Sequence, residues 1–241
     1  LALQESGEID RAIEQYDRAL ELRENCAEAQ RGKAIAFLTK NDLDRAHGAF
    51  IDVLRSSHGG PWWNAKTFDP SRGSGAALDR PLRASTFRIQ DAAEQVEYLV
   101  GQGLLHESFS EMAERYRDVL AEVEAEVGPD GTMTLTENQR AKIGNFFDRV
   151  LRYEDTPILA GSAINQDVDF NEIQENYLSS PVSVTTFDDF MTPEALAALR
   201  AFSLENTIFF KYSEARFVGS DLSVGFNCSV LYQMARELKA R

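Results

Sequence analysis

The sequence predicts a mainly α-helical chain that acquires strand-containing structure only near its C-terminus. Three observations support this fold class: a helical pattern recurs within residues 7–54, helical spacing of apolar residues dominates the middle, and alternating β-branched residues first occur at Pro181–Phe187. The chain has 241 residues, of which 43% are hydrophobic, so it has enough apolar material for a sizeable core.

Two segments near the N-terminus share one pattern at a spacing of 34 residues. This period, with small, aromatic, small and leucine positions, is typical of tetratricopeptide repeats, in which alanine lets two helices approach closely and the aromatic ring fills the space beside it. We expect such repeats over residues 1–57, the first one truncated because only the last turn of its first helix precedes residue 7. The matching sets are Ala12, Tyr16, Ala19 and Leu20, followed by Ala46, Phe50, Val53 and Leu54.

The first helix of the second repeat is predicted over Ala27–Lys40, with Ala34 and Phe37 at its small and aromatic positions. A single helix pair cannot bury its apolar faces alone, so neighbouring helices must cover it. The residues predicted to form the wall of a groove that binds a protein or peptide are Glu28, Arg31, Ile35 and Leu38. The alternative is that the two repeats only dock onto the next domain.

The middle of the chain is predicted as a loop or linker over residues 58–88 and a helical domain over residues 89–180. Capping boxes are predicted at Ser108–Glu111 and at Thr136–Gln139, each before a run of apolar residues at helical spacing. Asp169 is expected to cap a short helix. We expect Trp62 and Trp63 to anchor the linker to a core.

Residues 181–241 are predicted as the beginning of a small α+β domain. The alternation in Pro181–Phe187 predicts a strand, because β-branched side chains fit a pleated surface. Thr192 followed by Pro193 predicts a helix start, and Val230–Leu238 predicts a last amphipathic helix.

Charge and cysteine content narrow the classes of partner. The formal net charge of −14 disfavours nucleic acid and anionic membrane surfaces as partners. No apolar run reaches the length of a membrane helix, and the two cysteines, Cys26 and Cys228, are not a disulfide framework. We therefore expect a cytoplasmic protein whose Cys228 is a buried thiol.

The sequence contains no complete catalytic, cofactor-binding or metal-binding motif. None of the three histidines, His47, His58 and His106, belongs to a His-x-Asp or His-x-Glu pair. Cys-x-x-Cys and the glycine-rich phosphate motifs are also absent from the sequence. His58, beside two glycines, is expected to be the most exposed candidate ligand. The sequence accordingly predicts no catalytic, cofactor-binding or metal-binding residue.

Several stretches together resemble one known family. Phe187–Arg200 resembles the segment that opens the oxygenase domain in bacterial tetratricopeptide proteins of the 2-oxoglutarate and Fe(II)-dependent oxygenase superfamily. In that family a stretch similar to Glu205–Phe210 follows, then a loop that ends like Gly225–Phe226 and a helix similar to Leu231–Leu238. Gln90–Leu99 resembles the family's helix between the repeats and the oxygenase domain.

The resemblance implies an N-terminal, substrate- or partner-binding part of an oxygenase, with a jelly-roll domain only begun at residues 181–241. It implies Fe(II) and 2-oxoglutarate as cofactors of the full-length parent, whose iron-binding and 2-oxoglutarate-binding residues would lie beyond Arg241. This chain alone is expected to be inactive. Gln90 and Ile208 depart from the family's His and Trp. The alternatives are a non-catalytic interaction module, in which Arg31 or Lys33 meets an acidic partner segment, and a structural subunit of a larger complex.

Overall fold

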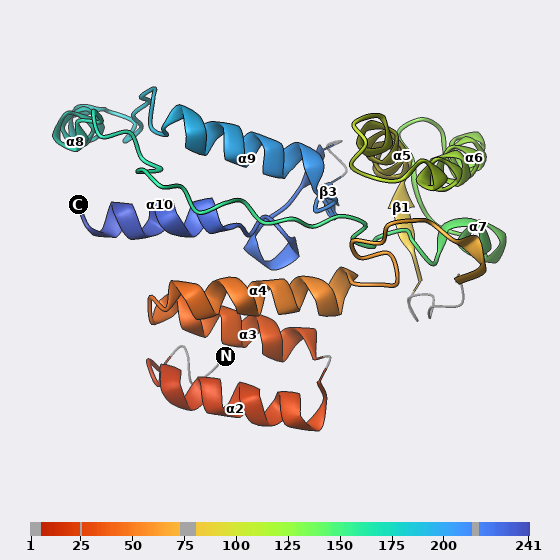
Figure 1. The fold of residues 1–241 in the computed structure, drawn as a ribbon, viewed down its shortest axis with the longest axis horizontal. Helices are drawn as coiled ribbons and strands as arrows, with labels where there is room; N and C mark the ends of the chain where they lie inside the picture. Colours follow the sequence, from red (N-terminus) through yellow and green to blue (C-terminus); the bar gives the residue numbers. More distant parts are fainter. Residues whose placement is uncertain (1–5, 25, 73–80, 214–216) are drawn as a thin grey trace. The chain divides into compact units, whose positions relative to one another are not determined.

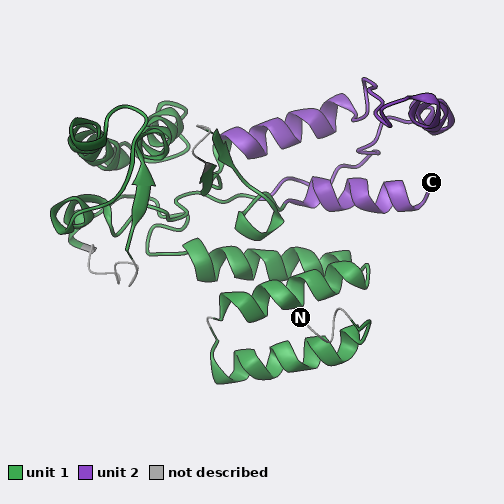
Figure 2. Cartoon of the chain, turned by 180° about the vertical axis from the view of Figure 1, so that it is seen from behind, with its two compact units in different colours: residues 1–154, 205–227 green, residues 155–204, 228–241 purple. Residues whose placement is uncertain are grey.

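The computed structural model describes residues 6–24, 26–72, 81–213 and 217–241, and these are mainly helical (Figure 1). The predicted last helical turn before residue 7 falls largely outside the described residues. The chain divides into two compact units: Leu1–Glu154 with Glu205–Asn227, and Asp155–Leu204 with Cys228–Arg241 (Figure 2). The four predicted domain ranges stay predictions.

The first unit begins with three stacked helices, α2 (Ile9–Leu22), α3 (Ala27–Thr39) and α4 (Leu43–His58) (Figure 1). Asp42 caps α4 by accepting a hydrogen bond from the backbone N–H of Arg45. The small and aromatic repeat positions lie where the helices meet, as the 34-residue period predicts. Those that are buried are Ala12, Ala34, Phe37, Ala46, Phe50, Val53 and Leu54.

The aromatic position of the first repeat depends on a glycine in the next helix. A Cβ atom at Gly32 would lie 2.4 Å from Cζ of Tyr16, far inside van der Waals contact. Gly32 therefore provides the space into which the Tyr16 ring packs between α2 and α3.

A second part of this unit contains a two-stranded antiparallel sheet and a pair of packed helices. Trp62 is fully buried in its core, which confirms that this residue anchors the irregular segment after α4. Strands β1 and β2 pair in antiparallel fashion, and α5 packs against α6. The elements are η1 (Pro70–Arg72), β1 (Arg83–Ser85), α5 (Thr86–Gly101), η2 (Glu107–Phe109), α6 (Ser110–Val127), β2 (Thr132–Thr134) and α7 (Glu137–Ile143).

The local predictions for this region are partly right. The capping box of Thr136 and Gln139 is present. The box predicted at Ser108–Glu111 is wrong, because Nδ1 of His106 accepts the hydrogen bond from Ser108 N–H and starts η2 instead. The helix after Thr136 ends at Ile143, and Asp148 beyond it has a left-handed φ of 64°. The pairing of β1 with β2 was not predicted.

The chain returns to the first unit over residues 205–227. Asn206 is 1% exposed, and its side chain accepts a hydrogen bond from Glu154 N–H at 2.6 Å and donates one to Glu154 O at 3.1 Å. Oγ1 of Thr207 accepts hydrogen bonds from the N–H groups of Leu151 at 2.8 Å and Arg152 at 3.1 Å. These bonds hold the returning segment on an extended stretch of backbone that belongs to no strand.

The same segment then covers the last repeat helix. It contains a two-stranded antiparallel sheet and a short turn of helix that packs on α4. Nδ2 of Asn227 donates a hydrogen bond to the carbonyl of His47 at 3.1 Å. Gly225 has a φ of 118°, and a Cβ there would lie 2.9 Å from Ile208, so both conformation and space require glycine. The elements are β3 (Lys211–Ser213), β4 (Phe217–Gly219) and η3 (Leu222–Val224).

The second unit contains α8 (Phe170–Ser179), most of α9 (Pro193–Glu205) and α10 (Ser229–Lys239). The predicted caps are confirmed: Asp169 accepts hydrogen bonds from two N–H groups of α8, and Thr192 accepts one from Ala195 N–H at 3.3 Å. One buried apolar cluster of this unit contains Ala163, Ala195 and Val230, with partly buried apolar residues around them.

The strand predicted at Pro181–Phe187 is wrong, because these residues are irregular. Ser183 has a left-handed φ of 49°, which breaks the extended conformation, and Val182 and Val184 are 72% and 62% exposed. A β-branched alternation forms a strand only when a neighbour pairs with it. The strands of the described residues form two small sheets, and the jelly roll stays a prediction.

Glu237 holds α10 onto the loop before α8. Its carboxylate accepts hydrogen bonds from Ser162 Oγ, from the N–H groups of Ala163 and Ile164, both at 2.9 Å, and from Gln233 at 3.1 Å. Burial by itself raises the pKa of this carboxyl group, but the hydrogen bonds outweigh it and lower the pKa to about 2.

We expect Asn206→Ala to lower the free energy of unfolding by about 2–4 kcal/mol, because it leaves both backbone groups of Glu154 without their partner. Urea denaturation of the full chain measures this. Asn138→Ala, at an exposed position of α7, serves as the control and should change the value by less than about 0.5 kcal/mol. Equal stability of the two variants would contradict the role of Asn206.

We expect Glu237→Gln to lower the free energy of unfolding by about 1–2 kcal/mol at pH 7, because charge-assisted hydrogen bonds are lost. The folded pKa of Glu237 lies below the unfolded value of about 4.3, so its contribution is present above that pH and is lost toward pH 2. The difference between variant and wild type should therefore shrink from pH 5 to pH 2 in urea titrations. Two results would refute this account. One is a stability difference between Glu237→Gln and wild type that does not change with pH. The other is an equal difference between wild type and Glu175→Gln, a variant in α8.

Candidate functional site

The four residues predicted to bind a partner divide into two groups. Glu28 and Arg31 are exposed and Ile35 is 43% exposed, and their spacing places them on one face of α3. Leu38 instead packs partly buried against Ala34, Phe50 and Val53. Hydrogen bonds from its own backbone N–H and from the Cys26 thiol lower the pKa of Glu28, so this face carries a carboxylate beside a guanidinium.

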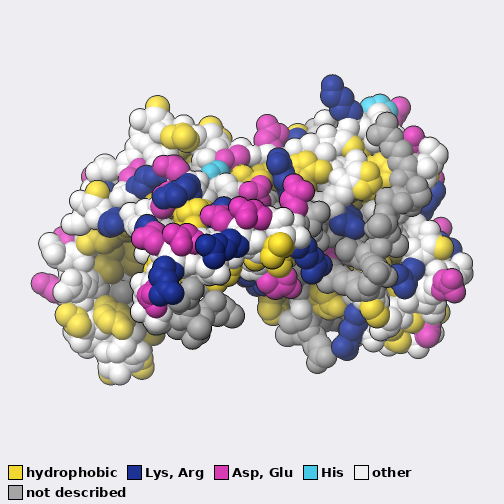
Figure 3. All heavy atoms as spheres, turned by 90° about the horizontal axis from the view of Figure 1, so that it is seen from below, with side chains coloured by type: hydrophobic (Ala, Val, Ile, Leu, Met, Phe, Trp, Pro, Cys, Tyr) yellow, Lys and Arg dark blue, Asp and Glu magenta, His cyan; other side chains and the backbone are white. Residues whose placement is uncertain are grey.

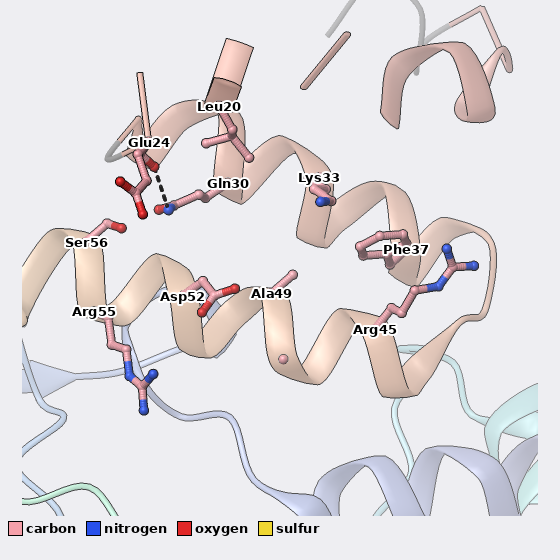
Figure 4. A pocket seen from close by; sticks show the side chains of 11 residues that line it. Leu20, Glu24, Gln30, Lys33, Phe37, Arg45, Ala49, Asp52, Arg55 and Ser56 are labelled. Carbon is pink, nitrogen blue, oxygen red and sulfur yellow. Dashed lines mark hydrogen bonds between the residues drawn. The ribbon is translucent and has the colours of Figure 1, made fainter. Parts of the chain in front are cut away.

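A groove of about 690 Å³ lies elsewhere on the repeat helices. It runs between α3 and α4 and is closed at one end by the last turn of α2 (Figure 4). At that end, Nε2 of Gln30 in α3 donates a hydrogen bond at 3.2 Å to the carbonyl of Glu24, which follows α2. The lining residues are Leu20, Glu24, Gln30, Lys33, Phe37, Arg45, Gly48, Ala49, Asp52, Arg55 and Ser56.

Gly48, an exposed residue in the middle of α4, lines the groove. Apart from its chain neighbours and the backbone of α4, no atom lies within 4 Å of the position that a Cβ would occupy there. Glycine in a helix interior costs about 1 kcal/mol relative to alanine, so this residue weakens α4. The sequence did not predict the groove, because the spacing of apolar residues does not reveal it.

Charged residues of both signs surround the apolar floor. Lys33 Nζ lies 2.5 Å from Asp17 Oδ1, and the Arg45 guanidinium lies 4.6 Å from the centre of the Phe37 ring. Asp52 also lines the groove, and no cation of the described residues forms an ion pair with it. Acidic and basic side chains are likewise interspersed on the side of the repeat segment that α2 presents (Figure 3).

The histidines and cysteines do not form a site. The expectation that His58 is exposed is wrong: it is 8% exposed, its ring stacks on Phe210 at 3.9 Å, and Nδ1 lies 3.0 Å from Asp148 O. Burial raises the pKa of the Cys228 thiol, as expected for a thiol without a nucleophilic role. Residues 205–227 decide the burial of His58, because Phe210 comes from that returning segment.

Over the described ranges, no group of three or more His, Cys, Asp or Glu side chains is placed to hold a metal ion. Within the same ranges, no helix has the length and apolar character needed to cross a membrane.

Comparison with known families agrees with the repeat pattern. Residues 1–61 match the family model described as tetratricopeptide repeat. Comparisons with characterised proteins and with solved structures find no significant match for the chain. The N-terminal region that contains the groove and the exposed face of α3 is therefore a tetratricopeptide-repeat segment.

Proposed function

We propose that the tetratricopeptide segment binds a peptide segment of a partner protein in the groove around Gly48. The observation that carries this proposal is the groove of about 690 Å³ between α3 and α4, whose lining combines apolar side chains with charged ones. Tetratricopeptide repeats generally serve protein–protein interaction, which favours a peptide over a small metabolite.

The chemistry of the groove suits a peptide. Phe37 and Ala49 provide an apolar floor for one or two side chains, while Gln30 and Ser56 offer polar groups to a peptide backbone. Lys33 and Asp52 on opposite walls provide charges of both signs, which would orient the peptide along the groove. The exposed face of α3, with Arg31 at its centre, remains the second surface on which such a partner could bind.

We expect Gly48→Trp to weaken peptide binding at least about tenfold, because Gly48 lines the groove and an indole at this position would occupy part of it. The Cβ of the new side chain would meet no neighbouring atom. Peptides are first selected from a phage-displayed random library on the immobilised wild-type chain. Their affinities for wild type and variants are then measured by fluorescence anisotropy. Gly48→Ala is the matched control: it should stabilise α4 by up to about 1 kcal/mol and leave the affinity within about twofold.

Two results would contradict binding in the groove. One is selected peptides that bind Gly48→Trp as tightly as wild type but lose affinity for Arg31→Glu, which would place the site on the outer face of α3. The other is the absence of any enriched peptide, which would remove the peptide-binding function of both surfaces.

A second candidate function rests on the resemblance of Phe187–Arg200, Glu205–Phe210 and Leu231–Leu238 to a family of 2-oxoglutarate and Fe(II)-dependent oxygenases. Under this proposal the repeat segment presents a protein substrate to an iron centre whose ligands are not among these residues. The iron would be held by two histidines and one carboxylate, and it would activate oxygen while 2-oxoglutarate is decarboxylated.

We expect this chain alone, supplied with Fe(II) and 2-oxoglutarate, to form no succinate, because its sequence contains no His-x-Asp pair. Succinate is measured by mass spectrometry. The natural reading frame is examined in parallel for a His-x-Asp motif after Arg241. Turnover by the isolated chain would refute this version, and a reading frame without the motif would remove the oxygenase proposal altogether.

A further inference from the structure

The first unit contains a cavity of about 340 Å³ that the repeat groove does not include. It lies among the end of α4, β1, the first turn of α5, β3 and η3. Aromatic and basic side chains dominate its lining, although the chain as a whole has a net charge of −14. The lining includes Arg83, Arg88, Lys211, Phe147, Phe210 and Asp148.

Arg88 is the central cation of this cavity. It is 5% exposed, and its guanidinium lies 5.6 Å from the ring centre of Phe147 and 5.7 Å from that of Phe210. Aromatic rings beside a guanidinium take up none of its N–H donors. Nη1 donates to Asp91 at 3.3 Å, and the buried Nε has no hydrogen-bond partner among the described residues.

A buried arginine with an unused donor is costly unless something completes its hydrogen bonds. Asp91 completes one of these bonds, and at 3.3 Å that bond is long. Arg88 therefore lines the cavity with a positive charge that the chain itself compensates only in part.

Two further cations, on β1 and β3, line the same cavity. Arg83 is exposed, and no carboxylate of the described residues forms an ion pair with it. The ammonium of Lys211 is half exposed and forms an ion pair with Asp221. The lining contains one carboxylate, Asp148, whose Oδ2 lies 3.8 Å from Nδ1 of His58. The lining thus has three permanent cations and one carboxylate, and Asp91 and Asp221, which are outside the lining, pair with Arg88 and Lys211.

We propose that this cavity binds a phosphoryl group, with Arg88 at its base and Arg83 and Lys211 at its mouth. A phosphate dianion accepts hydrogen bonds in several directions, which matches donors from three separate elements better than a planar carboxylate does. The volume lies at the lower end of the range for ligand sites, so it suits a small phosphate ester or a phosphorylated side chain. This inference is independent of peptide binding by the repeat groove.

The test is the thermal unfolding of the full chain at constant ionic strength with sodium phosphate, sodium acetate or sodium chloride. Phosphate at about ten times its dissociation constant should raise Tm by about 2–5 °C relative to chloride, and acetate should not. The double variant Arg83→Gln, Lys211→Gln should lose this rise. Both side chains are exposed, so the variant is expected to fold. Arg18→Gln, at an exposed arginine of α2, is the matched control and should keep it.

The phosphoryl group could belong to a small phosphate ester or to a phosphorylated side chain. Measuring the affinities of glycerol phosphate and of a phosphoserine peptide distinguishes these two sources, because the tighter binder identifies the source. A Tm that does not respond to phosphate would overturn the proposal. So would an equal response to acetate, or a phosphate response that the double variant retains.

Discussion

The first unit depends on a set of side-chain hydrogen bonds to one extended segment, residues 151–154. Asn64 donates to Tyr153 O and accepts from Tyr153 N–H, both at 2.8 Å. Asn206 and Thr207 bind the neighbouring peptide groups. Buried backbone groups must find partners, and here amide and hydroxyl side chains, of which Asn206 and Thr207 are buried, replace an adjacent strand. This arrangement holds two segments that are far apart in sequence on the same backbone.

These hydrogen bonds to residues 151–154 determine which surfaces of the repeat helices remain uncovered. Because Asn206 and Thr207 fix the start of the returning segment, η3 and Asn227 are brought onto α4 and cover part of it. Repeat helices need neighbours to bury their apolar faces, and this segment provides one. The outer face of α3 and the groove at Gly48 stay uncovered, so binding of a partner is proposed at these places.

The groove on the repeat helices and the cavity at Arg88 differ in chemistry, although both belong to an acidic chain. The groove mixes Lys33 and Asp52 around apolar residues, which suits a peptide that carries both polar and apolar groups. The cavity at Arg88 concentrates cations beside aromatic rings, which suits a compact anion. Local charge, and not the net charge of −14, therefore decides the class of ligand at each position.

The sequence by itself determined the repeat helices, the caps at Thr136, Asp169 and Thr192, and the absence of a complete catalytic motif. These features depend on residues within about one helical repeat of each other, so period and spacing reveal them. Only the tertiary structure decided that His58 is buried against Phe210, that Pro181–Phe187 is not a strand, and that a groove lies between α3 and α4. Each of these outcomes depends on which distant segment packs against the residue or fails to, and a local pattern carries no information about that neighbour.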